Sequence, residues 1–184
     1  YQDAIYKIDN QDFVTRVVGK WQYGSTEDGV LASEARIEGM NDFTINNDGE
    51  IFFQMSINGI QSIKKVDDLG VINTILTGFY FNDLTFNQSN ELYFSDSRKI
   101  YKLTETGDVV HIAGSGDYAY NGNNVEAKFA NINHPRDLHF DNEGNLYFTT
   151  AYGRIRKLDT QGIITTVVGN ENSSMPNIFN GMLI

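Results

Sequence analysis

The chain has 184 residues, of which 40% are hydrophobic and 21% charged, as expected for a folded domain and not for a disordered segment. Its net charge of −10 disfavours nucleic acid and anionic lipid as partners, because both would be repelled. The lack of cysteine excludes disulfides, thiolate metal sites and a cysteine nucleophile. No apolar run approaches the roughly 20 residues that a membrane-spanning helix needs, so membrane insertion is not expected.

The first recurring feature is a pair of short strands, called A and B here, joined by a turn of Asn, Asp, Ser or Gly. An alternating strand, a polar turn and an apolar strand are typical of a β-hairpin. The pair occurs three times, with A beginning at Asp42, Asp83 and Asp137, and B at Ile51, Leu92 and Leu146.

A second pair of strands, C and D, follows each A–B hairpin. The C strands cover residues 63–66, 100–103 and 155–158, and the D strands cover 71–76, 109–113 and 163–168. A fourth C–D pair opens the chain at residues 5–8 and 13–18. Each D strand ends near a glycine, namely Gly19, Gly78, Gly114 and Gly169.

Four short strands in each repeat are typical of a β-propeller blade. Consecutive apolar residues in strand B indicate burial on both faces, as between two neighbouring blades. The alternative of a flat β-sandwich does not explain four copies of the C–D pair. We predict an all-β propeller segment over residues 1–184, with a half blade at 4–18, blades at 41–77, 82–113 and 136–168, and a tail at 169–184.

The third repeat resembles the NHL repeat. The resemblance rests on the segments GSGDYAYNG and EAKFANINHP, and above all on GNLYF and on IRKLD followed by GIITTVVG. It covers nearly the whole chain, strongly in the third repeat and weakly in the first. It implies a β-propeller, usually of six blades, that binds proteins, RNA or carbohydrate. Related propellers include lactonases and peptide-amidating lyases.

Three and a half blades cannot close a six-bladed ring. An open half-ring would leave two blade faces exposed as a large apolar surface. The chain also begins at Tyr1 and not at Met, which suggests a processed or excised piece. We therefore expect its partners to include the remainder of its own propeller or a second copy of the chain, and favour the former.

Candidate ligand-binding residues gather on one face of the predicted propeller. Because strand direction alternates, the D-to-A links and the B-to-C turns share a face with the start of every A strand. Asp42, Asp83 and Asp137 begin the A strands there and could hold a cation or sugar hydroxyls. The structural alternative is that each carboxylate accepts backbone N–H groups at the strand start.

Aromatic residues lie in the long D-to-A links, which cover residues 19–41 and 114–136, whereas the link at 78–82 is short. Exposed aromatics could stack on sugar rings or on side chains of a protein partner, and the alternative is that they pack over neighbouring blades. The aromatic candidates are Trp21, Tyr23, Tyr118 and Tyr120.

The B-to-C turns on the same face add Arg98, Tyr152 and Arg154. Asp96 precedes Arg98, which suggests a local structural pair. Arg154 has no such acid close in sequence and is the better ligand candidate.

The three histidines do not predict a metal site. His134 and His139 are five residues apart, which is no recognised metal signature, although the related amidating lyases use several histidines as zinc ligands. His139 stands where the other A strands have threonine, and we expect it to face the channel. No catalytic residue or cofactor is predicted, with calcium and zinc as the ions left open.

The sequence as a whole predicts a non-enzymatic binding module for a glycan or a protein, in an extracytoplasmic, bacterial setting. The alternative is a metal-dependent propeller enzyme of the lyase or lactonase type, with its site in the central channel. A purely structural spacer is a third reading. The predicted ligand-binding residues are Trp21, Tyr23, Asp42, Asp83, Tyr118, Tyr120, Asp137, His139, Tyr152 and Arg154.

Overall fold

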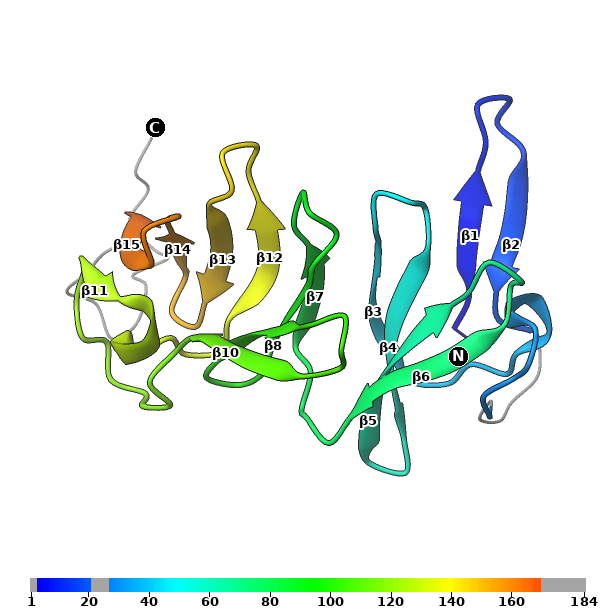
Figure 1. The fold of residues 1–184 in the computed structure, drawn as a ribbon, viewed down its shortest axis with the longest axis horizontal. Coiled ribbons are helices and arrows are strands. Elements are labelled where there is room, and N and C mark those ends of the chain that lie inside the picture. The colour runs from blue at the N-terminus through cyan, green and yellow to red at the C-terminus, as the bar shows by residue number, and fades with distance from the viewer. Residues whose placement is uncertain (1–2, 21–26, 170–184) are drawn as a thin grey trace. The chain divides into compact units, whose positions relative to one another are not determined.

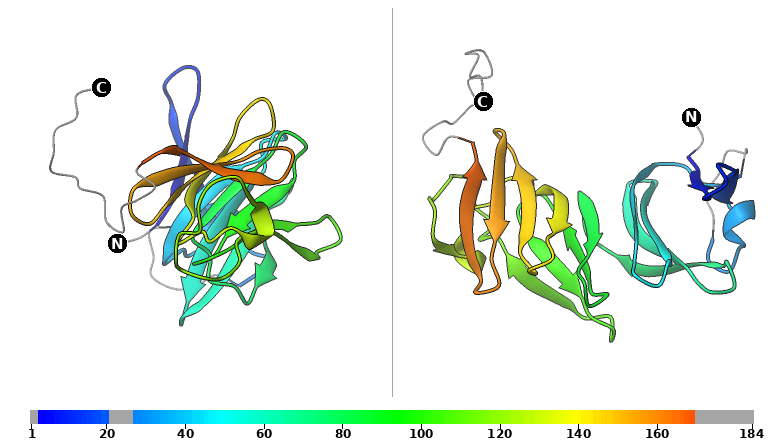
Figure 2. Two further views of the ribbon diagram at one scale, coloured as in Figure 1. Left: turned by 90° about the vertical axis from the view of Figure 1, so that its left-hand side faces the viewer. Right: turned by 90° about the horizontal axis from the view of Figure 1, so that it is seen from above.

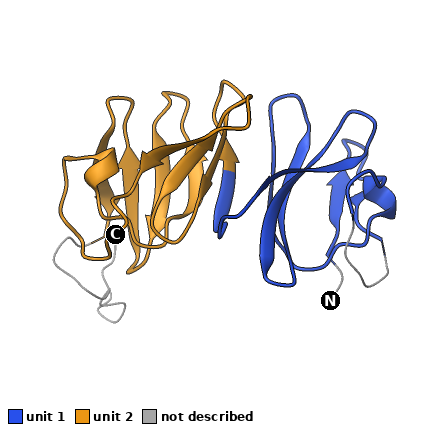
Figure 3. Cartoon of the chain, turned by 60° about the horizontal axis from the view of Figure 1, so that its bottom comes forward, with its two compact units in different colours: residues 1–84 blue, residues 85–184 orange. Residues whose placement is uncertain are grey.

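The computed structural model describes residues 3–20 and 27–169, and this part of the chain forms four antiparallel sheets with two short 3-10 helices (Figure 1). The predicted all-β fold is confirmed, and no described sheet is closed. No helix among these residues is long and apolar enough to cross a membrane. The chain divides into two compact units, Tyr1–Leu84 and Thr85–Ile184, which are described in turn (Figure 3).

Unit 1 contains a two-stranded hairpin and a four-stranded sheet in the order β3-β4-β5-β6. Its core is formed by apolar residues of the hairpin, the sheet and the link between them, among them Val18, Ile37 and Phe53. The elements are β1 (Ile5–Ile8), β2 (Val14–Val18), η1 (Ala32–Glu34), β3 (Met40–Ile45), β4 (Ile51–Ile57), β5 (Ile60–Val66) and β6 (Ile72–Thr77).

Unit 2 contains most of the sheet β10-β9-β8-β7, whose strand β7 begins at the unit boundary, and the five-stranded sheet β11-β15-β14-β13-β12 (Figure 2). Its core includes Ile132, Leu146, Phe148 and Ile164. The first elements are β7 (Asp83–Phe86), β8 (Leu92–Ser95), β9 (Ile100–Leu103) and β10 (Val109–Ala113). The others are β11 (Val125–Glu126), η2 (Ala127–Phe129), β12 (Arg136–Phe140), β13 (Leu146–Thr150), β14 (Arg154–Leu158) and β15 (Ile163–Val168).

One side chain organises each of six hairpin turns. Asp141 Oδ1 accepts the N–H groups of Glu143 at 2.9 Å and Asn145 at 2.8 Å. The same pattern recurs at Asp9, Asn46, Asp67, Asn87 and Asp159. A short polar side chain that bonds its own backbone stabilises a tight turn. The Asn- and Asp-rich segments therefore close hairpins, as their composition indicates.

The long D-to-A links each pair with the outer edge of the next sheet, which the sequence alone does not predict. In unit 2, Val125 of β11 lies opposite Ile164 of β15, so this sheet has five strands and not the predicted four. In unit 1, Leu31 forms an isolated bridge with Val71. We call these segments, residues 29–32 and 124–127, the clasps. They cover backbone groups that would otherwise be exposed at a strand edge.

Each clasp is also bonded to the D strand before it. The N–H of Gly19 donates to the carbonyl of Ala32, and the N–H of Gly114 donates to the carbonyl of Ala127, both at 2.9 Å. Gly114 has a φ of +100°, and a Cβ there would lie 2.2 Å from the carbonyl oxygen of Arg98. Glycine is therefore required at this position by both conformation and space.

The residue that precedes the clasp of unit 1 is tied to β5 and β6 by a buried charge. Lys64 is only 4% exposed, and its ammonium donates to Asp28 Oδ1 at 2.8 Å and to Thr74 Oγ1 at 2.7 Å. Desolvation opposes the charged form of Asp28, but the hydrogen bonds from Lys64 and Thr74 hold its pKa below the ordinary value. The equivalent position in unit 2 is Arg156, which is 1% exposed and donates to the Gly122 carbonyl at 2.9 Å.

Candidate functional site

The predicted binding face is described best in unit 2, where it comprises link 114–135 and turns 96–99 and 151–153. We call this surface the loop face. Within it, Arg98 and Tyr118 form a stacked pair, with the guanidinium carbon 3.7 Å from the ring centroid. Arg98 also hydrogen bonds to the Tyr118 hydroxyl and donates to the Gly116 carbonyl at 2.9 Å. Tyr118 nevertheless remains 55% exposed. The pair therefore presents an aromatic ring to solvent in a fixed position.

The carboxylate of Asp96 organises the turn that carries Arg98. Its Oδ1 accepts the backbone N–H groups of Arg98 and Lys99, both at 2.7 Å, and its Oδ2 accepts the Tyr101 hydroxyl at 3.0 Å. Burial and the adjacent carboxylate raise the pKa of Tyr101. The expected pairing of Asp96 with Arg98 therefore involves the backbone N–H of Arg98, while the Arg98 guanidinium contacts residues of link 114–135.

Tyr120 and Arg154 pack together inside this part of unit 2. Arg154 is 5% exposed, and its guanidinium lies 4.6 Å from the centroid of the Tyr120 ring. The guanidinium of Arg156 lies 5.0 Å from the same centroid, and the Tyr120 hydroxyl is 3.2 Å from Thr166 Oγ1. This arrangement corresponds to the packing alternative for the aromatic residues. It anchors the link to strands β14 and β15, and it leaves little of the Arg154 side chain accessible to a ligand.

The three aspartates that begin the A strands do not have identical surroundings. Asp42 is half-buried and accepts the N–H groups of Phe43 at 2.8 Å and Leu84 at 2.9 Å. Asp137 is exposed, has a φ of +50°, and accepts the Thr149 hydroxyl at 2.6 Å. Asp83 is half-buried. Asp42 therefore has the structural role of bonding backbone donors.

Two further predicted residues are exposed. Tyr152 is 45% exposed and has a φ of +71°, next to Gly153 in the turn between β13 and β14. His139 lies on β12, opposite Tyr147 of β13, and is exposed. Of the other predicted residues, Trp21 and Tyr23 lie outside the described part of the chain. Within residues 3–20 and 27–169, no group of three or more His, Cys, Asp or Glu side chains is placed to hold a metal ion.

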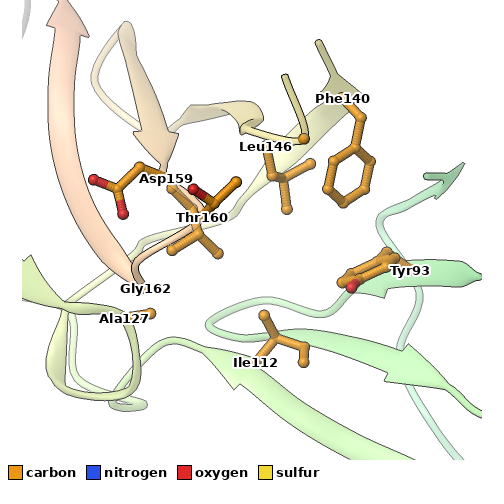
Figure 4. A pocket seen from close by; sticks show the side chains of 10 residues that line it. Tyr93, Ile112, Ala127, Phe140, Leu146, Asp159, Thr160 and Gly162 are labelled. Atoms are coloured by element: carbon orange, nitrogen blue, oxygen red, sulfur yellow. The ribbon is translucent and has the colours of Figure 1, made fainter. Parts of the chain in front are cut away.

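A pocket of about 230 Å³ lies within unit 2 between the sheet of β7–β10 and the sheet of β11–β15. Figure 4 shows Ile112, Phe140 and Leu146 around a common space, with Tyr93 at one side and Thr160 at another. Its lining includes turn residues at the opposite ends of the strands from the loop face, such as Gly144 and Gly162. Burial raises the pKa of Tyr93, so its hydroxyl stays protonated. The sequence alone does not predict this pocket, because its residues come from five separate segments.

Comparisons with known proteins agree on the family. The sequence model of the teneurin NHL domain matches residues 80–180, which is more than half of the chain. Teneurin-1 of Gallus gallus is 36% identical over 97 residues, covering 45% of this chain and 4% of that protein. Teneurin-1 of Homo sapiens is 37% identical over 97 residues with the same coverage. The chain thus matches only a small part of the length of these relatives.

Solved structures show the same fold at low sequence identity. A Bacteroides thetaiotaomicron protein of unknown function has a TM-score of 0.66 at 20% identity, covering 91% of this chain and 42% of that one. An auxiliary nutrient binding protein from Bacteroides ovatus has a TM-score of 0.60 at 14% identity, covering 88% and 46%. Virginiamycin B lyase from Staphylococcus aureus has a TM-score of 0.53 at 21% identity, covering 89% and 47%. The repeated antiparallel sheets, the NHL motifs and the match over residues 80–180 together show that this chain belongs to the teneurin NHL domain family of β-propellers.

Proposed function

We propose that this NHL module is a non-enzymatic binding module that recognises a protein or a glycan through the loop face of unit 2, in an extracytoplasmic setting. The observation that carries the proposal is the Arg98–Tyr118 pair. Tyr118 is 55% exposed, yet its ring is held 3.7 Å from the Arg98 guanidinium. Ordering a free side chain costs about 0.5–1.5 kcal/mol on binding. A ring that is already fixed avoids much of this cost.

The chemistry of the pair suits both kinds of partner. One face of the Tyr118 ring is covered by Arg98, and an aromatic ring can pack against an apolar sugar face or a partner side chain. Tyrosine and arginine are also the residue types enriched at the energetic centres of interfaces. Tyr152, which is 45% exposed on the same face, would extend the contact surface.

The test is a binding screen on an array of glycans and on an array of secreted and cell-surface protein domains, using the purified chain. A partner is expected on one of the two arrays, and Tyr118→Ala is expected to weaken its binding by about 30-fold or more, as for an interface hot spot. Arg98→Lys should cause a smaller loss because lysine lacks the planar stacking surface. Tyr6→Ala is the matched control, because Tyr6 is 48% exposed on β1 in unit 1. A partner that binds wild type and Tyr118→Ala equally would refute the loop face as the site.

A further inference from the structure

The outer edge of β10 differs from the corresponding edges of β6 and β15. β10 is the end strand of its sheet, and no clasp pairs with it in the described part of the chain. In the long links, the clasp alanines follow the glycine that ends the D strand by 13 residues, as Ala32 follows Gly19. The link at 78–82 before β7 is too short to supply such a segment.

The solvent exposure of one equivalent residue in the three D strands reflects this difference. Ile72, Val109 and Ile164 are equivalent, because they pair with the last residues of their C strands, Val66, Leu103 and Leu158. Ile72 and Ile164, which lie beside clasps, are 0% exposed. Val109 is only half-buried, and the adjacent Gly107 and Asp108 are exposed.

The side chains of β10 lack the features that usually prevent strand addition, and its bulge between His111 and Ala113 has counterparts in β6 and β15, which do pair with clasps. Natural edge strands carry lysine, proline or inward-pointing charges that block pairing with another chain. β10 has the sequence VVHIA, with no proline, lysine or carboxylate, and its second residue, Val110, is 40% exposed. The equivalent strands β6 and β15 are also uncharged, and both are covered by clasps.

We propose that the outer edge of β10 binds an extended peptide segment of a partner protein by strand addition, in the position that a clasp takes on β6 and β15. The clasp of unit 1 defines the bonds. The Ile72 N–H donates to the Val30 carbonyl, and the Gly29 N–H donates to the Ile72 carbonyl, both at 2.9 Å. The Ala32 N–H donates to the Gly70 carbonyl at 2.7 Å. On β10 the corresponding groups are the N–H and carbonyl of Val109 and the carbonyl of Gly107.

The clasps also define the chemistry of the segment. Both place Val two residues before an alanine, Val30 before Ala32 and Val125 before Ala127, and both alanines are buried. The peptide therefore has an apolar residue, any residue, and then alanine. On β10 the turn next to Gly107 carries the exposed carboxylates Glu105 and Asp108, so a basic residue after the alanine is favoured by charge.

The probe is a capped synthetic peptide containing residues 27–32 of this chain followed by lysine, added to the whole chain. Binding is expected by calorimetry, with slowed hydrogen exchange of the Val109 N–H. N-methylation at the position of Ala32 removes a donor that bonds the strand and should weaken binding by about tenfold or more. N-methylation at the position of Leu31, whose N–H makes no hydrogen bond within the part of the chain that the structure describes, is the matched control and should have a smaller effect.

Two protein variants complete the test. Val110→Lys places a charge on the edge and should weaken peptide binding, whereas Leu69→Lys, at an 81% exposed aliphatic side chain, should not. Equal binding to both variants would overturn the proposal. So would protection at Ile72 or Ile164 in place of Val109, since the peptide would then be displacing a clasp. Protection of Val109 that grows with protein concentration without peptide would also overturn it, and would identify a second copy as the occupant.

Discussion

Replacing Asp28 with alanine removes the carboxylate that accompanies a buried lysine. Lys64 Nζ lies 2.8 Å from Asp28 Oδ1, and the lysine side chain is 5% exposed, whereas that of Asp28 is 46% exposed. In Asp28→Ala the Thr74 hydroxyl, at 2.7 Å, remains as a side-chain partner of the ammonium. The substitution also removes the side-chain link between the residue that precedes the clasp of unit 1 and strands β5 and β6.

The size of the effect follows from the unequal exposure of the two partners. Breaking a fully buried ion pair costs about 3–5 kcal/mol, because the remaining charge is left without compensation. Asp28 is about half exposed, so water screens the pair and can reach the vacated site. We expect the free energy of unfolding to fall by about 2 kcal/mol. Lys64→Met removes the buried charge itself, so the double variant should recover most of that loss.

The measurement is urea denaturation of wild type, both single variants and the double variant, followed by circular dichroism. Glu34→Ala is the control, because its ion pair with Lys20 is exposed on both sides and should not move the urea midpoint. A loss below about 0.5 kcal/mol for Asp28→Ala, or a double variant no more stable than Asp28→Ala, would refute the reasoning.

The pH dependence gives an independent check on the same pair. The folded pKa of Asp28 lies below its unfolded value of about 3.9, so its contribution is complete above that pH. It is lost as the pH falls through the folded pKa. The difference between wild type and Asp28→Ala should therefore be constant near neutral pH and should narrow below about pH 4.

Three further predictions concern stability. In thermal unfolding, Gly114→Ala should lower the free energy of unfolding by at least about 2 kcal/mol more than Gly107→Ala. Both glycines have positive φ, but only at Gly114 would a Cβ lie against backbone atoms. Equal losses would show that the backbone around Gly114 can shift to make room. In urea denaturation, Tyr120→Ala should lower the free energy of unfolding by about 2–3 kcal/mol, because the ring no longer packs on the two guanidinium groups. Tyr120→Phe, which removes only the hydroxyl, should lower it by less than about 1 kcal/mol. The hydrogen bond from Lys102 lowers the pKa of Glu91, so acid should remove a stabilising contribution below about pH 4.3, and Glu91→Gln should reduce this acid sensitivity.

Much of the fold could be predicted from local features of the chain. Alternation and consecutive apolar residues located the strands, and the Asn and Asp residues located the turns, because both signals act over a few neighbouring residues. The clasps were missed although DGVLA and NNVEA resemble each other in sequence. Two residues that pair with a strand about 40 positions away, as Val125 does with Ile164, leave no period to detect.

The candidate site was less predictable than the fold. Tyr118 and Tyr120 are two residues apart in one Gly-rich link, and nothing in that spacing distinguishes them. One is 55% exposed against Arg98, and the other lies half-buried against Arg154 and Arg156. Arg154 was expected to be available for a ligand because no acid lies close to it in sequence. The ring that covers it belongs to Tyr120, 34 positions away, so this contact is not visible in the local sequence.

The sequence by itself determined the all-β class, the repeat, the strands and the turns, because periodicity, turn chemistry and hydrogen bonds within a hairpin are local. Tertiary structure alone decided which strand edges are covered and which loop side chains stay exposed. Both depend on where a long link meets strands from another repeat. The same kind of Gly-rich link therefore supplies a structural clasp at residues 124–127 and an exposed, fixed ring at Tyr118.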